Sequence, residues 1–357
     1  MMHGHIYNIM CKAASAFAVL LSVLFISSCD KVHEFPEIPE RVSYSLRLEY
    51  ELPLPIWEHY IEINSRPGTT RAVQTEGQMR YVIRLYPRDA ASGIVSSRYT
   101  EEYVFYRDLS EGYDTEVTLD APAGDYEMRV WSDLLKDPSD MFYDYSDFSR
   151  INIRGRHVAN TDYRDAFRGS HNITLLADIY ERLPESYTVK MQRPLAKYEF
   201  ITNDLIEFAR KEAQRIESKN NAGSSVTTAP VQRINYNDYR VVFYYVGFMQ
   251  DTYSMFTDKQ VDAVTGITYE SKLTQLNDSE ASLGFDYVFI GNEETSVTVQ
   301  IGLFHKDGTQ LAMTQPIEVP IRRSWHTILR GRFLMSEASG GVVIDPTFDG
   351  DFNLVFP

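Results

Sequence analysis

The sequence predicts a mainly β protein made of two tandem β-sandwiches, the second with one amphipathic helix laid against it. From Arg41 onward, short alternating runs rich in Tyr, Val, Ile and Phe are separated by Gly, Asp, Asn and Pro, which is the pattern of antiparallel sheets. The 357 residues exceed a single domain of roughly 100–200 residues. With 43% hydrophobic, 13% aromatic and 24% charged residues, the composition is near the globular average, which excludes wholesale disorder and fibrous repeats.

Residues 1–28 are predicted to be a lipoprotein signal peptide. Lys12 precedes an apolar run, residues 13–26, that leads into the tetrapeptide Ile26-Ser27-Ser28-Cys29. This run of 14 residues is too short to cross roughly 30 Å of hydrocarbon, and its small-residue end favours cleavage. The tetrapeptide matches the bacterial lipobox, which predicts that Cys29 is acylated and becomes the first residue of the mature chain. Either Met1 or Met10 can start translation.

Residues 29–40 are predicted to be a tether between the lipidated cysteine and the folded part, because they are acidic and broken by prolines. The chain has two cysteines, and since Cys11 lies in the removed peptide, no thiol remains for a disulfide. Acyl chains contribute about 0.8 kcal/mol per buried CH₂, so we expect a lipid-anchored outer-membrane protein without a transmembrane helix. Acidic residues after such a cysteine resemble the surface-export signals of Bacteroidota lipoproteins, while a solvated linker has the same composition. The surface and periplasmic faces therefore both stay open, with the surface favoured.

Residues 41–185 are predicted to form the N-terminal sandwich. Alternating apolar residues predict strands at Ser43–Glu51 and Met79–Tyr86. Between them, residues 52–77 carry no sustained period and are expected to form a long loop with an edge strand at 60–63. Trp131 is expected to be a core anchor. The other strands of this domain are expected at 115–119, 126–131, 148–153 and 172–176.

Residues 190–357 are predicted to form the C-terminal sandwich, reached through a crossover at 183–194. Apolar residues at near-helical spacing between Leu205 and Ile216 predict one amphipathic helix over residues 203–219, whose apolar face covers a sheet. Gly266 and Gly308 stand where hairpins need a positive φ. The strands are expected at 195–201, 240–250, 267–273, 285–290, 296–304, 310–313, 316–321 and 333–334.

Four segments carry a resemblance to known proteins: residues 29–37, Glu51-Leu52-Pro53-Leu54, residues 193–200, and residues 324–351 with the turn Ala338-Ser339-Gly340-Gly341. Together they resemble an uncharacterised-domain family of Bacteroidota lipoproteins, in which two transthyretin-like or immunoglobulin-like sandwiches follow a lipidated cysteine. This family is similar to fimbrial anchor and tip lipoproteins, the fimbrillin accessory proteins. The resemblance covers nearly the whole mature chain. It implies a surface protein, an anchoring or accessory subunit of a fimbria-like assembly, and it brings no catalytic residues.

Charge and motifs disfavour several function classes. Fifty Asp and Glu against 35 Lys and Arg give a net charge of −15, which disfavours general nucleic-acid binding because phosphates need cationic partners. Neither a phosphate loop nor a dinucleotide fingerprint occurs, and H-E-x-x-H and G-x-S-x-G are absent too. We therefore expect no enzyme, no cofactor and no metal site, although a triad that assembles only in space leaves no mark in the sequence. The histidines lack metal-ligand spacing and are expected at the surface or in turns: His59, His157, His171, His305 and His326.

An acidic segment and the aromatic content leave two further alternatives open. Residues 133–147 carry five aspartates, whose oxygens suit Ca²⁺, but the EF-hand order and its glycine are missing, so a solvated loop is favoured. The 24 Tyr and 3 Trp make contact with carbohydrate conceivable. Exposed coplanar rings at Trp57 and Tyr60, or at Tyr143 and Tyr145, would favour it, and their burial would argue against it.

The sequence thus favours a non-catalytic outer-membrane surface lipoprotein, an anchor, accessory or adhesin-like subunit of a fimbria-like assembly. The alternative is a glycan-binding lipoprotein of a nutrient-uptake system. The expected partners are the outer membrane, through Cys29, and pilin-like subunits, whose extended segments would pair with a strand edge. The candidate partner-binding strand is Phe352, Asn353, Leu354, Val355 and Phe356.

Overall fold

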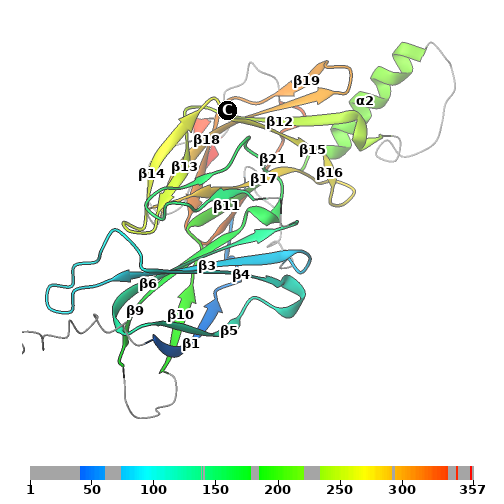
Figure 1. Ribbon diagram of the computed structural model, residues 1–357. Coiled ribbons are helices and arrows are strands. Elements are labelled where there is room, and N and C mark those ends of the chain that lie inside the picture. Colours follow the sequence, from blue (N-terminus) through cyan, green and yellow to red (C-terminus); the bar gives the residue numbers. More distant parts are fainter. Residues whose placement is uncertain are drawn as a thin grey trace, which may run out of the picture.

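The computed structural model describes residues 41–60, 74–137, 139, 141–177, 185–220, 234–291, 294–336, 343–344 and 354–355. Across these ranges the protein is mainly β with one α-helix, as predicted. The strands form two sandwiches with a smaller sheet at their junction (Figure 1).

The N-terminal sandwich consists of β1 (Arg41–Tyr50), β3 (Gln78–Pro87), β4 (Glu101–Asp108), β5 (Thr115–Pro122), β6 (Gly124–Leu135), β9 (Ala166–Leu175) and β10 (Glu185–Met191). A three-stranded sheet, in the order β10-β1-β5, packs on a four-stranded sheet, in the order β4-β3-β6-β9. The two sheets pack through the alternate side chains of their strands, which point to one face. In β1 these are Tyr44, Leu46 and Leu48, which all point inward and are 0% exposed. One side is closed where β9 meets β10, and Gly169 permits this approach because a Cβ there would lie 2.5 Å from Val189 Cγ1.

The C-terminal sandwich consists of β2 (Ile56–Tyr60), β11 (Leu195–Thr202), β12 (Tyr239–Tyr245), β15 (Thr268–Lys272), β16 (Thr274–Gln275), β17 (Ala281–Phe289), β18 (Glu294–His305), β19 (Gln310–Met313), β20 (Ile317–Arg322) and β21 (His326–Gly331). One sheet has the order β16-β17-β11-β21-β2 and faces a second with the order β15-β12-β18-β19, in which β20 also pairs with β18. Helix α2 (Leu205–Asn220) buries Leu205, Phe208 and Ala209 against this core. It begins after Asp204, whose carboxylate accepts from the Met335 amide at 2.9 Å.

The junction is built by a small sheet and an apolar cluster shared by both sandwiches. The sheet has the order β14-β13-β8-β7 and consists of β7 (Tyr143–Asp144), β8 (Ile151–Ile153), β13 (Phe248–Ser254) and β14 (Lys259–Thr265). In the cluster, Trp131 of β6 packs near Phe289 of β17, with Tyr143 and Tyr253 from the small sheet. Trp131 is 0% exposed and is a core anchor, as predicted. The core that it anchors is the one between the two sandwiches.

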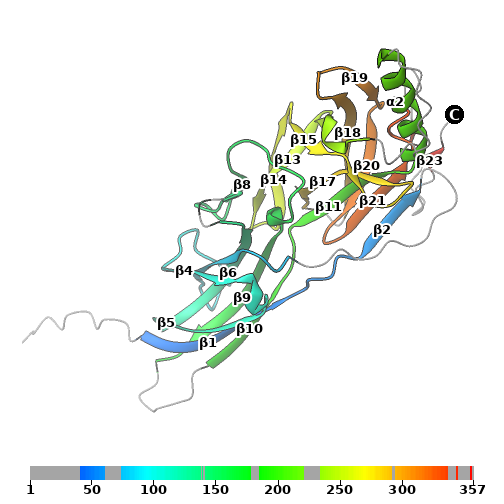
Figure 2. The same ribbon diagram turned by 90° about the vertical axis from the view of Figure 1, so that its right-hand side faces the viewer.

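Two strands lie outside the ranges that the sequence predicted for their sandwich. β10 falls within the predicted crossover, yet it pairs in parallel with β1 from Tyr44↔Glu185 to Tyr50↔Met191. β2 joins the C-terminal sandwich by pairing in parallel with β21. The chain therefore crosses between the sandwiches three times, from β1 to β2, from β2 back to β3 and from β10 to β11, and Figure 2 shows β1 and β2 running into different sandwiches. The division into domains at 41–185 and 190–357 stays a prediction.

Three predicted strands or turns differ in the structure. The single strand expected at 240–250 is two strands, because Gly247, with φ of 100°, breaks it and sends β13 into the small sheet. Gly266 and Gly308 do have positive φ, of 72° and 88°, but most of the turn expected before Gly266 is strand β14. The strand expected at 333–334 is wrong: both residues are buried in an irregular segment after β21, and Leu334 begins a turn there.

Candidate functional site

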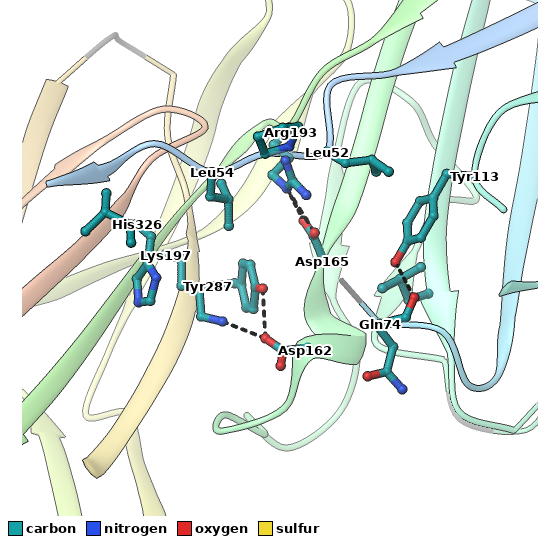
Figure 3. Close-up of a pocket in the computed structure, with 13 residues that line it drawn as sticks. Leu52, Leu54, Gln74, Tyr113, Asp162, Asp165, Arg193, Lys197, Tyr287 and His326 are labelled. Carbon is teal, nitrogen blue, oxygen red and sulfur yellow. Dashed lines mark hydrogen bonds and ion pairs between the residues drawn. The ribbon is translucent and has the colours of Figure 1, made fainter. Parts of the chain in front are cut away.

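A cavity of about 360 Å³ lies where the two sandwiches meet, beside the segment that connects β1 to β2 (Figure 3). That segment contributes an apolar side, formed by Leu52, Leu54 and Ile56. The opposite side is charged and comes from β11, β17 and the 3₁₀ turn η2 (Asp162–Arg164). The complete lining is Leu52, Pro53, Leu54, Ile56, Gln74, Tyr113, Leu134, Asp162, Asp165, Arg193, Lys197, Tyr287 and His326.

The charged side of the cavity consists of two ion pairs that join the sandwiches. Lys197 Nζ lies 2.6 Å from Asp162 Oδ1, which also accepts from the Tyr287 hydroxyl at 3.0 Å. Arg193 Nε donates to Asp165 Oδ1 at 2.8 Å, and Arg193 Nη1 donates to the Glu51 carbonyl at 2.7 Å. Arg193 therefore holds both η2 and the connecting segment. Each of these cations has a carboxylate partner, so the two pairs leave no net charge for a ligand ion.

A third polar pair, His326 and Glu199, lies at the contact between β11 and β21. His326 Nε2 is 3.3 Å from Glu199 Oε2, and Ser282 Oγ donates to Glu199 Oε1 at 2.7 Å. Burial alone would raise the pKa of Glu199, but the hydrogen bonds from His326 and Ser282 and the charge of Lys197 outweigh it and lower that pKa to about 2. Glu199 is therefore ionised in the folded protein at neutral pH.

Asp286 of β17 is the centre of a buried hydrogen-bond network behind the cavity. Its carboxylate accepts from Arg164 Nη1 and from the Tyr245 hydroxyl, each at 2.7 Å, and lies 2.7 Å from His157 Nε2. Burial would raise the pKa of Asp286, yet Arg164, His157 and Tyr245 together hold it below its ordinary value. Because Arg164 and His157 precede β9 while Asp286 lies in β17, this network fixes the two sandwiches to each other.

The cavity presents no recognisable catalytic constellation. Among the described residues, its lining contains no serine, threonine or cysteine, and the hydroxyls it does contain are the phenols of Tyr113 and Tyr287. It does contain two carboxylates, and burial raises the pKa of Asp165 above the ordinary value. Both Asp162 and Asp165 are nevertheless held on cations, an arrangement that positions strands.

This junction was not predicted from the sequence, although β11 carried a signal for it. Lys197 and Glu199 are charged residues inside a strand whose eight residues are all buried. Charges at such positions need partners from another element, which is what Asp162 and His326 supply. Which elements supply the partners depends on where the chain crosses from β10 to β11, and this crossing left no local pattern.

Most of the predicted site residues lie outside the described ranges. Cys29 is among them, so its lipidation stays a prediction, as do the roles of Phe352, Asn353 and Phe356. Leu354 and Val355 form β23 (Leu354–Val355), which pairs antiparallel with β22 (Val343–Ile344) of the same chain. Within the described ranges, no helix is long and apolar enough to cross a membrane.

The expectation for the histidines is wrong at two positions. His157 is 8% and His326 is 5% exposed, and both contact buried carboxylates instead of lying at the surface. His305 does lie at the β18–β19 turn, where its ring is 3.0 Å from Asp307, and His171 is exposed on β9. His59 lies in β2.

The acidic segment 133–147 does not converge on one point. Asp133 is fully buried in β6, and Arg80 donates to it at 2.7 Å and 2.9 Å. Asp137, Asp144 and Asp147 each accept from a serine amide two residues onward, and Asp140 lies outside the description. Among the described residues, no group of three or more His, Cys, Asp or Glu is placed to hold a metal ion.

The two aromatic pairs named for carbohydrate contact do not form open platforms. Tyr143 is 1% exposed and packs on Trp131, which argues against the pair with Tyr145. Trp57 stacks on Arg322, whose Cζ lies 4.7 Å from the Trp57 ring and 4.8 Å from the Trp325 ring. One face of Trp57 is therefore taken by a guanidinium, and the ring of Tyr60 is outside the described part of the chain.

Comparisons with known proteins give a family match and several similar folds. The model of a family of unknown function, DUF6562, matches residues 39–357, which confirms the resemblance to an uncharacterised-domain family. No curated protein matches the chain.

Three similar solved structures come from Bacteroidota. A candidate adhesin from Bacteroides ovatus is 11% identical with a TM-score of 0.38, over 79% of this chain and 83% of that one. The fimbrial anchor protein Mfa2 from Porphyromonas gingivalis is 11% identical with a TM-score of 0.35, over 76% and 82%. A fimbrial assembly protein from Parabacteroides distasonis is 12% identical with a TM-score of 0.35, over 84% and 93%.

Proposed function

We propose that this chain, which belongs to the DUF6562 family of unknown function, is a non-catalytic surface lipoprotein of the outer membrane. Within that role it acts as an anchor, accessory or adhesin-like subunit of a fimbria-like assembly. The observation that carries the proposal is the junction of the two sandwiches. Its buried charges, around Asp286 and in the Lys197–Asp162 and Arg193–Asp165 pairs, are paired with one another across the two sandwiches. A rigid two-sandwich body on a lipid tether suits a structural subunit.

The anchor itself is tested by replacing Cys29 with Ala. We expect the natural chain to incorporate labelled fatty acid and to fractionate with the outer membrane, because the acylated cysteine is the only attachment that the proposal requires. Cys29→Ala should lose the label and leave the outer-membrane fraction. Cys11→Ala is the matched control, since this cysteine precedes the cleavage site and should behave as the natural chain does. An unlabelled natural chain, or Cys29→Ala retained in the outer membrane, would contradict the anchor.

Strand addition at the C-terminus is the proposed mode of partner binding. In the described residues β23 uses one edge to pair with β22, and a partner's extended segment would add to the other edge through main-chain hydrogen bonds. Deleting residues 351–357 should therefore reduce the recovery of co-purifying subunits from solubilised outer membranes. The far-ultraviolet circular dichroism should stay unchanged, because in the described part of the chain β22 and β23 form a two-stranded sheet separate from the sandwich sheets. Unchanged recovery of every subunit from a folded deletion variant would remove this mode.

A further inference from the structure

We propose that a strip of tyrosines along β4 is a contact site for a neutral glycan. Tyr99, which precedes β4 by two residues, and Tyr106 of β4 are each 43% exposed, and Val104 of β4 is 39% exposed. Tyr145, from the loop after β7, is half-buried beside them. Burial first, then the neighbouring Tyr106 and Glu102, raise the pKa of Tyr145 against the lowering effect of Arg80, which agrees with a common location. β4 is the edge strand of its sheet.

Two buried arginines hold two of these three rings, those of Tyr145 and Tyr99, in place. Arg80 Cζ lies 4.4 Å from the Tyr145 ring centroid, and Arg84 Cζ lies 4.5 Å from the Tyr99 ring centroid. Because Arg80 is 0% and Arg84 is 3% exposed, the guanidinium groups lie on the protein side of the rings and the other side is turned outward. Each arginine is fixed in turn by a carboxylate, Asp133 at 2.7 Å and Glu102 at 2.5 Å. Rings fixed before binding lose little conformational entropy when a ligand arrives.

The chemistry of the strip selects a sugar over other ligands. An aromatic face beside an aliphatic residue suits the apolar C–H face of a pyranose, while tyrosine hydroxyls and the Glu102 carboxylate can bond its hydroxyls. Arg84 Cζ is also 6.0 Å from the Tyr145 ring, so Tyr99 and Tyr145 flank one guanidinium and lie within reach of one short oligosaccharide.

Charge and size narrow the ligand further. Glu102, the exposed Asp108 at the end of β4 and the net charge of −15 disfavour an acidic glycan. Val104 is the one aliphatic residue of the strip. A single exposed aliphatic side chain is too little apolar surface for the centre of a protein–protein interface. The ligand class is therefore a neutral oligosaccharide. This inference rests on the proposed surface role only for access to such glycans.

The strip is tested by binding of the full chain, purified in mild detergent, to arrayed oligosaccharides. The probes are neutral glucan, mannan and xylan fragments, with heparin and polygalacturonate fragments as acidic competitors. We expect at least one neutral fragment to bind, and Tyr99→Ala, Tyr106→Ala and Tyr145→Ala each to weaken it by about tenfold, measured by titration calorimetry. The matched control is Phe248→Ala, an aromatic ring that is 72% exposed at the turn between β12 and β13 and should not change binding.

Three results would overturn the inference. They are no binding of any neutral fragment, binding that the three tyrosine variants leave unchanged, and tyrosine-dependent binding of an acidic glycan or a protein instead. Circular dichroism of each variant shows that a loss of binding is not a loss of fold. Failure here is distinguishable from failure of the proposed function, because fractionation of the natural chain and of Cys29→Ala does not depend on the strip.

Discussion

Replacing Arg164 by Met is expected to lower the free energy of unfolding by about 3–5 kcal/mol, because it leaves the Asp286 carboxylate buried without its cation. Arg164 is 1% exposed and Asp286 is 1% exposed, so solvent cannot take over the lost interaction. Arg164 Nη2 also donates to the Tyr287 carbonyl at 3.1 Å, which ties the same side chain to the backbone of the other sandwich. The quantity to measure is the free energy of unfolding from urea denaturation at pH 7.

Two further variants make this result specific. Arg150→Met breaks an ion pair to Asp262 whose partners are both 55% exposed, and it should cost no more than about 1 kcal/mol. The double variant Arg164→Met/Asp286→Leu removes the uncompensated charge and should recover part of the lost stability. If Arg164→Met costs no more than Arg150→Met, the buried network does not hold the sandwiches together.

Stability should fall steeply in acid, with Glu199 as a main contributor. Its pKa is lowered from an ordinary value of 4.5 to about 2, so the folded state favours the ionised form. The stabilisation is fully present above about pH 4.5 and is lost as the pH falls towards about 2. Glu199 is 7% exposed, and a displacement of this size corresponds to about 3 kcal/mol.

The Glu199→Gln variant isolates this contribution. Its stability should be lower than that of the natural chain at pH 7, and the difference should shrink as both proteins are titrated from pH 5 to pH 2. Glu207→Gln is the control, because the Glu207–Arg332 pair is about half exposed and its loss should leave the pH profile nearly unchanged. Parallel profiles for Glu199→Gln and the natural chain would show that Glu199 is not stabilised as described.

Local pattern was enough to predict the fold class and most strands. The alternation in β1, the periodicity of α2 and the positive φ of Gly308 all follow from interactions within a few residues of each other. β10 was missed because flanking prolines made it resemble a linker, although Tyr187, Val189 and Met191 alternate inward. Its parallel partner, β1, is more than 130 residues away in the chain, and no local rule indicates such a pairing.

The junction could not be predicted, for a related reason. Lys197, Arg193 and Asp286 have ordinary sequence neighbours, and their significance appears only when the chain crossings between the sandwiches bring η2, β11 and β17 together. The burial of His157 and His326 follows from the same crossings. The tyrosine strip was missed because a tyrosine on an edge strand and one in a core strand have the same local sequence pattern, and only the sheet order distinguishes them.

Experiments on intact cells decide whether this protein is a surface-anchored subunit that binds other proteins. Surface-protease cleavage of the natural chain is followed in parallel with recovery of its partners from gently solubilised outer membranes. We expect protease cleavage of the natural chain on intact cells and recovery of a pilin-like subunit. Both the cleavage and the recovery should be lost in Cys29→Ala. Protection from protease, or recovery of a transporter or a glycan-uptake lipoprotein in place of a pilin-like subunit, would contradict it.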